Sequence, residues 1–277
     1  MKAQLMNTIK STVKFSLSLV AAAAALSSSL AQAHGYWLLP SSTVLSAPQF
    51  VTFDAAVSND PFHFNHRPLA VDEVQVTAPD GSNQRLQNVS KGELRTTFDV
   101  NFEQKGTYRI SNYREGVRAS WKEDGQPKRF MGKIEEFKQR VPANAQELKV
   151  SEIANRLETF VTVGSPSPLK TNGHGLEIIS SVHPNDLVAG EPLTLQFLVD
   201  GKPTAGVEVE VIRGQTRYRN QKGEQKLKTD ADGKVKIELP EAGMYWLDAD
   251  FVDHKVKTKE ASERSLAYVL TLEVLPQ

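Results

Sequence analysis

The sequence predicts a mostly β fold made of two antiparallel β-sandwich domains, with a short helical or irregular insertion in the first. Apolar and polar residues alternate in several short runs, which is typical of half-buried strands. Asp-Gly pairs stand between the runs, where a tight reversal needs a positive φ. A turn followed later by Gly-x-Tyr occurs in each half of the chain. These three observations predict strands, reversals and a duplicated architecture.

The alternating runs mark the expected strands in order along the chain. Each run places apolar side chains at every second residue, as a strand with one buried face requires. The expected strands cover residues 50–57, 71–78, 107–110, 193–199, 207–212, 235–239 and 266–275. Gly, Pro, Asn and Asp residues bound these runs, as in antiparallel sandwiches.

The turns suggest that the two halves share one plan. Asp-Gly pairs occupy residues 80–81, 124–125, 200–201 and 232–233. The first pair is followed by 106-GTYRI-110 and the last by 243-GMYWL-247, and each Gly-x-Tyr is expected to open an inner strand. We further expect 229-TDADGKV-235 to form a hairpin turn.

A boundary between two domains is expected near residue 170. Residues 164–175 are rich in Gly, Pro and Ser and are expected to hold no regular structure. The expected domains are residues 34–168, β-rich with a candidate metal site, and residues 169–277, a β-sandwich. Helices are expected at 133–140 and 147–157, separated by Pro142, as a flap or connector on the first domain.

The composition argues against several functions. The 277-residue chain has 33 Lys and Arg against 33 Asp and Glu and no basic run, which argues against binding to nucleic acid. It has no cysteine, so disulfides and thiolate chemistry are excluded. Gly-x-Ser-x-Gly, a phosphate-binding glycine loop and His-Glu-x-x-His are all missing from the sequence. We therefore expect a protein that is not an enzyme.

Residues 1–33 have the pattern of a secretory signal peptide. Lys2, Lys10 and Lys14 form a positive region, residues 15–26 form an apolar region, and 31-AQA-33 fits the site at which signal peptidase cuts. The sequence therefore predicts export to the periplasm, with cleavage after Ala33. No other stretch approaches 18 apolar residues, so we expect a mature product that is not an integral membrane protein.

His34 is the first candidate metal ligand. At a mature N-terminus it would present an α-amine and an imidazole nitrogen that chelate one ion together, and a second histidine could complete a set of three nitrogens. Such sites suit copper and nickel. The alternative is a frayed chain end without a role, although the apolar 35-GYWLLP-40 favours order.

A second candidate is the loop 58-SNDPFHFNHRPL-69, which carries His63 and His66. Its two prolines argue against regular structure, and a loop can bring ligands together that a strand would separate. The alternative is a loop with Phe62 and Phe64 anchored in the core and both histidines outside as ordinary polar residues. We expect His63 and His66 to join His34 as metal ligands. The other histidines, His174, His183 and His254, have no donor nearby at ligand spacing.

Several segments of the mature chain carry a family resemblance. They include 34-HGYWLLPS-41 and residues 54–69, 119–130, 158–166, 175–209, 214–220 and 229–235. In these segments the chain resembles the NikM-like exported proteins, periplasmic accessory components of nickel or cobalt uptake. The resemblance implies an immunoglobulin-like β-sandwich in the second domain, a role in transition-metal handling, and an inner-membrane or outer-membrane metal transporter as partner. The short His-Gly-Tyr at 34–36 is also similar to the copper histidine brace of lytic polysaccharide monooxygenases and, more loosely, to small periplasmic copper carriers.

Three functions stay open at this point. The first is a non-catalytic periplasmic protein that binds nickel, cobalt or copper through His34, His63 and His66. The second is a copper-dependent oxidase of the histidine-brace type. The third is an adhesion or scaffold module with incidental histidines. Stoichiometric metal binding separates the third from the others, and reductant-dependent oxygen consumption separates the second from the first.

Overall fold

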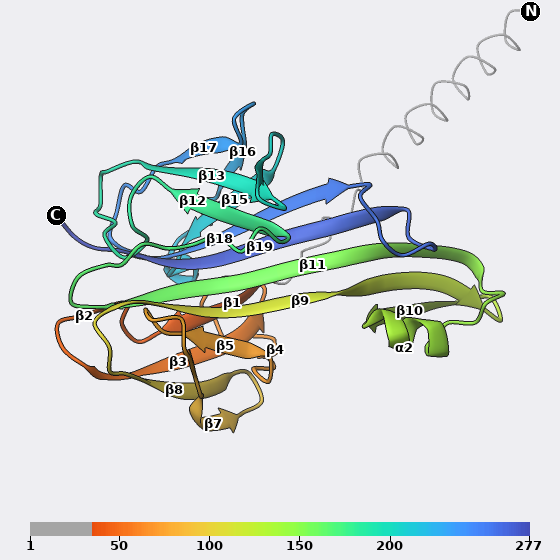
Figure 1. Ribbon diagram of the computed structural model, residues 1–277, viewed down its shortest axis with the longest axis horizontal. Coiled ribbons are helices and arrows are strands. Elements are labelled where there is room, and N and C mark those ends of the chain that lie inside the picture. Colours follow the sequence, from red (N-terminus) through yellow and green to blue (C-terminus); the bar gives the residue numbers. More distant parts are fainter. Residues whose placement is uncertain (1–34) are drawn as a thin grey trace, which may run out of the picture. The chain divides into compact units, whose positions relative to one another are not determined.

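The computed structural model describes residues 35–277, which form three β-sheets (Figure 1). The expected signal peptide and His34 lie outside the described residues. Antiparallel pairing prevails, and the predicted mostly β fold with packed, sandwich-like sheets is confirmed. No helix among residues 35–277 is both long enough and apolar enough to span a bilayer.

The first sheet is five-stranded and contains the start of the described chain. In it β1 is an edge strand that pairs with β3, and β3 pairs in turn with β8 and β4. The strands of this sheet are β1 (Gly35–Pro40), β3 (Gln49–Ser58), β4 (Arg67–Pro68), β7 (Gln87–Lys91) and β8 (Thr96–Phe102).

The second sheet is ten-stranded and contains the longest strands. Its strands are β2 (Val44–Leu45), β5 (Val74–Thr77), β6 (Asn83–Gln84), β9 (Gly106–Glu123), β10 (Gln126–Gly132), β11 (Gln146–Val163), β15 (Glu208–Arg213), β16 (Gln225–Lys228), β18 (Gly243–Asp253) and β19 (Glu263–Val274). Most neighbours are antiparallel, but β11 runs parallel to both β19 and β2. This departs from the purely antiparallel pairing expected.

The third sheet is four-stranded. It comprises β12 (Leu176–Ser180), β13 (Leu193–Val199), β14 (Lys202–Pro203) and β17 (Lys234–Ile237). A short 3-10 helix, η1 (Thr216–Tyr218), follows β15.

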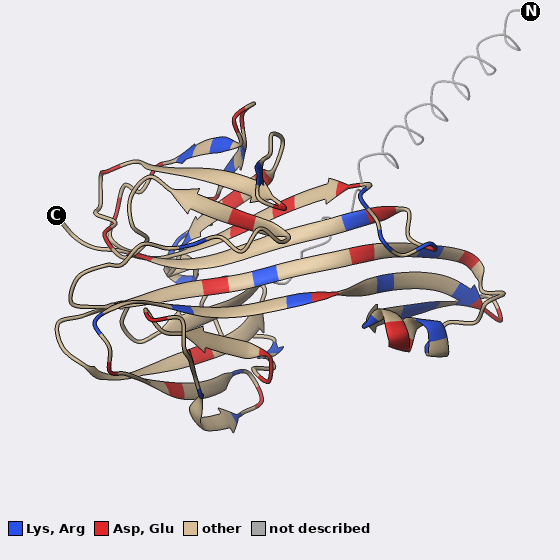
Figure 2. Cartoon of the chain, viewed as in Figure 1, with Lys and Arg blue, Asp and Glu red and all other residues tan. Residues whose placement is uncertain are grey.

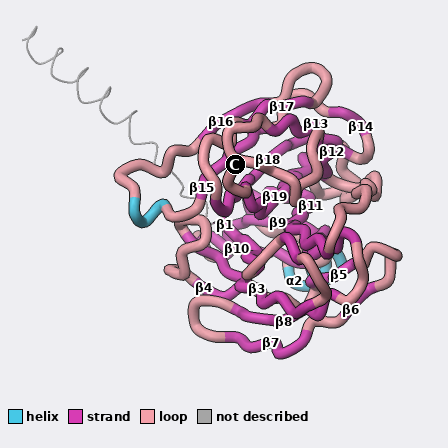
Figure 3. The backbone as a smooth tube through the Cα atoms, turned by 90° about the vertical axis from the view of Figure 1, so that its left-hand side faces the viewer, coloured by secondary structure: helices cyan, strands magenta, loops and turns pink. Residues whose placement is uncertain are grey.

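The ten-stranded sheet is the middle layer of three, because its two faces serve different cores. On β18, Trp246 belongs to the core shared with the first sheet, whereas Leu247 belongs to the core shared with the third. On β11, Leu157 and Val161 face the first core and Phe160 faces the second. Successive strand residues point to opposite faces, so one strand can supply both cores. Figure 3 shows the three layers with the first sheet and the third sheet on opposite sides.

The insertion predicted in the first half combines a helix with a strand. The helix α2 (Ile134–Arg140) matches the expected helix at 133–140, and its Phe137 packs with Phe130 and Val117 in a third apolar cluster. The helix expected at 147–157 is wrong, because these residues lie in β11. There they pair with β9 on one side and β19 on the other, and these two ladders outweigh a local helix preference.

The expected turns form, with one correction. Asp124 and Gly125 have φ of 50° and 73°, and Asp200 and Gly201 have 50° and 76°, as hairpin turns between paired strands require. Residues 229–235 do not form a hairpin. Strand β16 before this segment pairs with β15, whereas β17 after it pairs with β13 in another sheet, so the turn carries the chain between layers.

The Gly-x-Tyr motifs play the same part in both halves. Strand β9 begins at Gly106 and β18 begins at Gly243, and the tyrosine two residues later is buried in each case. The hydroxyl of Tyr108 accepts a hydrogen bond from the backbone N–H of residue 104 at 2.7 Å, and that of Tyr245 donates to the carbonyl of residue 241 at 2.7 Å. A tyrosine bonded to the backbone a few residues upstream is a known corner device of β-sandwiches.

Candidate functional site

The loop that carries the two candidate histidines starts beside the first described residue. Gly35 on β1 is paired with Ser58 at the end of β3, and loop 59–66 follows directly. The Ser58 hydroxyl accepts a hydrogen bond from Trp37 Nε1 at 2.9 Å and donates to the carbonyl of Asp60 at 2.6 Å. The pairing of β1 with β3 therefore fixes the position at which the loop begins.

Aromatic contacts hold the loop against the first core. The ring centroids of Phe62 and Phe64 lie 5.5 Å and 5.2 Å from that of Trp37. Both phenylalanines are partly buried against the core. The alternative to metal binding predicted this anchoring of the loop. Phe62 has a φ of 62°, a strained value for a bulky side chain that the surrounding packing must hold in place.

The structure directs His63 and His66 into different hollows. Half-buried His63 lines a hollow with Leu39, with Arg213 at the end of β15 and with the segment that follows. His66 is exposed and lines a separate, larger cavity. Within residues 35–277, no three His, Cys, Asp or Glu side chains converge so that they could hold a metal ion. The loop therefore supplies single histidine donors, and His34, the third predicted ligand, lies outside the described residues.

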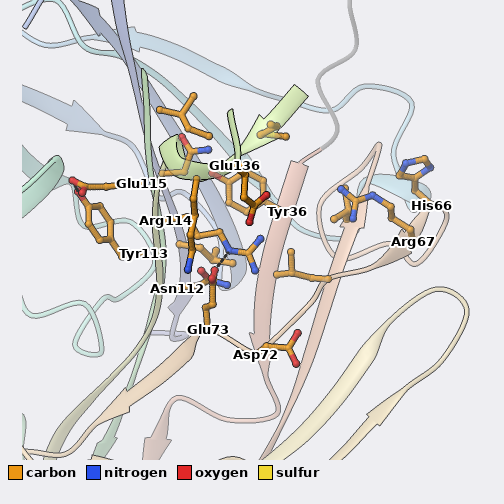
Figure 4. Close-up of a pocket in the computed structure, with 18 residues that line it drawn as sticks. Tyr36, His66, Arg67, Asp72, Glu73, Asn112, Tyr113, Arg114, Glu115 and Glu136 are labelled. Atoms are coloured by element: carbon orange, nitrogen blue, oxygen red, sulfur yellow. Dashed lines mark hydrogen bonds and ion pairs between the residues drawn. The ribbon is translucent and has the colours of Figure 1, made fainter. Parts of the chain in front are cut away.

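The larger cavity measures about 750 Å³. Its wall includes side chains from β1, β9, β11 and the start of the insertion, and Figure 4 shows Tyr36, Asn112 and Arg114 turned toward it with His66 at one end. The Nε of Arg114 lies 2.6 Å from a carboxylate oxygen of Glu73. The cavity lies on the side of the central sheet that also carries the first sheet, because Leu157 contributes both to its wall and to the first core.

Two buried polar atoms at this cavity have no hydrogen-bond partner among residues 35–277. They are the hydroxyl of Tyr36 and the Oδ1 of Asn112. Burial raises the pKa of Tyr36 well above its ordinary value, and the negative charges of Asp248 and Asp250 raise it further, while Arg114 opposes them. The phenol therefore stays protonated at physiological pH.

A row of carboxylates continues along the same face of the central sheet. Glu208 is paired with Asp250 and Glu210 with Asp248 across β15 and β18. Burial raises the pKa of Asp248 to about 8, and Asp250 and Glu210 add to the increase. Like charges directly opposite each other on paired strands destabilise a sheet. At neutral pH Asp248 therefore retains a proton that an exposed aspartate would lose.

The sequence contains a weak signal for these acidic residues, although they match no known motif. Acidic residues occur at every second position in 208–210 and again in 248–250, which predicts one acidic face on each strand. That the two faces adjoin depends on the register of β15 and β18, which one sequence does not reveal. Figure 2 shows acidic and basic residues interspersed along the central strands as well, so charge alone does not mark a site.

Comparison with known proteins gives one family match. A family described as a domain of unknown function (DUF4198) matches residues 31–253. No curated protein matches the chain.

Among solved structures, the similarity is weak. The Yersinia pseudotuberculosis adhesin InvE shares 13% identity over 86% of this chain and 59% of its own, with a TM-score of 0.22, so this chain spans well under two thirds of that structure. The D0–D1 domain of intimin shares 12% identity over 86% of this chain and 97% of its own, with a TM-score of 0.23. The FN1–FN3 domains of chicken CNTN1 share 8% identity over 86% of this chain and 98% of their own, with a TM-score of 0.19. These TM-scores are too low to carry information on function.

Proposed function

We propose that this chain, which belongs to the DUF4198 family, is an exported periplasmic protein. In this proposal it binds a divalent transition metal and catalyses no reaction. The ligands are the α-amine and imidazole of His34 together with histidine from loop 59–66, where His63 and His66 are the donors available. The metal is nickel, cobalt or copper, and it is the cargo of the protein. A membrane transporter of the NikM-like uptake systems would be the partner that receives it.

The observation that carries this proposal is the pairing of Gly35 with Ser58. Gly35 is joined to His34 by one peptide bond, and consecutive Cα atoms across a trans peptide are about 3.8 Å apart. Ser58 is the last residue before the histidine loop. The strand register therefore places Gly35, the first described residue, at the start of the loop that carries the other two candidate donors.

The chemistry of these donors favours late first-row metals. An α-amine and neutral imidazoles are nitrogen ligands of intermediate softness, which suit nickel and copper in tetragonal geometry. Copper is expected to bind most tightly in vitro because it ranks above nickel and cobalt for nitrogen sites of this kind. The chain has no cysteine to offer a thiolate in competition.

Calorimetric titration with nickel and copper tests the proposal. The chain beginning at His34 should bind one ion, and a form that retains Ala33 should bind much more weakly because its amide nitrogen is a poor donor at neutral pH. His34→Ala and His63→Ala should each weaken binding, and His66→Ala shows whether His66 participates. The matched control is His174→Ala, since exposed His174 lies in the segment between β11 and β12. Binding should fall as the pH drops through about 6.5, because protonated imidazole does not coordinate.

Two results would count against the proposal. Equal affinity for the forms that begin at Ala33 and His34 would show that the free amine is not a ligand. Reductant-dependent oxygen consumption by the copper-loaded protein would replace the non-catalytic function with the copper oxidase alternative.

A further inference from the structure

The cavity beside Tyr36 combines open volume with unmet hydrogen-bonding capacity. Its volume of about 750 Å³ falls in the range of about 300–1,000 Å³ that is usual for small-molecule sites. Asn112 is only 5% exposed, yet its Oδ1 has no partner among residues 35–277, and the same holds for the buried hydroxyl of Tyr36. A buried polar group left unpaired costs about 1–3 kcal/mol, so such groups are rare and call for an explanation.

The two atoms have complementary requirements. The Tyr36 phenol is kept protonated by burial and by the nearby Asp248 and Asp250, so it has a proton to donate. The amide oxygen of Asn112 can only accept. A metal ion or an ammonium group cannot accept the proton of Tyr36. An anion without a hydroxyl group cannot donate to Asn112. A hydroxyl group satisfies both atoms, because it donates one hydrogen bond and accepts others.

The rest of the wall also favours an uncharged ligand. Its charges nearly cancel, since the acidic side chains are Asp72, Glu73, Glu115 and Glu136 and the basic ones are Arg67, Arg114 and Lys133. Arg114 and Glu73 are already paired with each other. Apolar side chains between these groups, including Leu69, Leu157 and Val57, offer contact to C–H groups. Figure 4 shows Asn112 and Arg114 on one side of the cavity and Tyr36 reaching toward them from β1.

We propose that this cavity binds a neutral, hydroxyl-rich molecule of the mono- or disaccharide class, with Tyr36 as a hydrogen-bond donor and Asn112 as an acceptor. The ligand would place hydroxyl groups on the two buried polar atoms and its C–H faces on the apolar wall. This site goes beyond the proposed metal function, because no metal takes part in it.

The test uses metal-free mature protein and a fixed set of sugars. Saturation-transfer NMR is run with glucose, galactose, mannose, N-acetylglucosamine, maltose and cellobiose at millimolar concentration, and at least one should receive saturation. For that sugar, Tyr36→Phe and Asn112→Leu should each lower the affinity at least tenfold. Both variants should keep the melting temperature or raise it, because each removes an unpaired buried polar atom. Tyr218→Phe is the control, since Tyr218 is 82% exposed and lines the hollow of His63, and it should bind as the unmodified protein does.

Three outcomes would overturn the proposal. The first is that none of the six sugars binds. The second is that binding survives both Tyr36→Phe and Asn112→Leu in folded protein. The third comes from two charged probes measured in the same way: glucuronate or spermidine binds while every neutral sugar fails. Since metal is absent throughout, each outcome is independent of whether the N-terminal metal site exists.

Discussion

Asp248 shows how a single half-buried carboxyl links stability to pH. Burial and the neighbouring Asp250 and Glu210 raise the pKa of Asp248 to about 8, whereas an aspartate in an unfolded chain titrates near about 3.9. The folded state therefore keeps a proton that the unfolded chain releases between about pH 4 and pH 8. The contribution of Asp248 to the free energy of unfolding is therefore fully present below about pH 4, and it is lost as the pH rises toward 8.

Replacing Asp248 should remove this dependence. We expect Asp248→Asn to raise the free energy of unfolding by about 1 kcal/mol or more at pH 8 and to have little effect at pH 4. Urea denaturation at both pH values measures the difference. Glu93→Gln, at an exposed loop position, is the control and should change neither value appreciably. An equal effect of Asp248→Asn at the two pH values would show that the raised pKa is not the cause.

Gly233 is a residue at which the backbone leaves no room for a side chain. It has a φ of 73°, and a Cβ there would lie 2.7 Å from the backbone nitrogen of Thr204 and 2.8 Å from the backbone oxygen of Phe197. We expect Gly233→Val to lower the free energy of unfolding by about 2 kcal/mol or more, since strain at positive φ and a steric clash combine. Gly81→Val measures the backbone strain without the clash, because Gly81 has a φ of 87° and a Cβ there would have nothing within 4 Å. Equal losses in thermal denaturation would mean that the close approach at Gly233 plays no part.

At the scale of elements, a buried ionic network holds the segment between β11 and β12. Arg156 is 3% exposed and donates to the carbonyls of Leu176 and His174 at 3.2 Å and 2.8 Å. It also lies 3.5 Å from Glu158 and 3.9 Å from Glu177. Glu177 in turn accepts hydrogen bonds from the backbone N–H groups of residues 172 and 173. Residues 164–175 hold no regular structure, as expected, yet they are fixed to two strands.

Removing the centre of this network should be costly. We expect Arg156→Met to lower the free energy of unfolding by about 3–5 kcal/mol. Glu177 would stay buried without its cation, and Glu158 would keep Arg109 alone as a basic partner within residues 35–277. Limited proteolysis should also become faster within residues 164–175. The control is Lys122→Met, which breaks the exposed pair of Lys122 with Glu147 at 2.7 Å and should cost at most about 1 kcal/mol. Similar losses in denaturant titrations of the two variants would argue against the network.

Strands along which burial alternates could be predicted from the sequence, and the central strand β11 could not. The runs at 50–57, 193–199 and 266–275 alternate and correspond to β3, β13 and β19. Strand β11 is buried on both faces over its second half, so alternation is lost there. Its first half has a local helix preference that the pairing with β9 and β19 outweighs. Strand β8 is not among the expected strands, although Phe98, Val100 and Phe102 alternate with polar residues and are all fully buried. That signal was present in the sequence.

For the whole molecule, the three-layer arrangement depends on contacts that local patterns do not encode. The predicted duplication is visible in the tyrosine corners at Tyr108 and Tyr245. Sharing of the central sheet between two cores follows from the parallel pairing of β11 with β19, two strands that are more than 100 residues apart. The predicted boundary between residues 168 and 169 stays a prediction.

The candidate sites were predictable to different degrees. The histidine loop and the anchoring of Phe62 and Phe64 could be predicted from residue types and spacing. The separation of His63 from His66 could not be predicted, because it depends on the path of the loop between β3 and β4. The unpaired atoms of Tyr36 and Asn112 depend on where β1 meets the central sheet, and no motif marks them.

The central claim is that the mature chain begins at His34 and carries a transition metal there. Native mass spectrometry of the exported protein, purified without chelators from cells supplied with nickel, cobalt and copper, tests both parts in one spectrum. The account predicts the mass of residues 34–277 plus one transition-metal ion, with the ion lost in His34→Ala and retained in His174→Ala. A chain that begins at another residue, or one that begins at His34 and carries no metal, would contradict it.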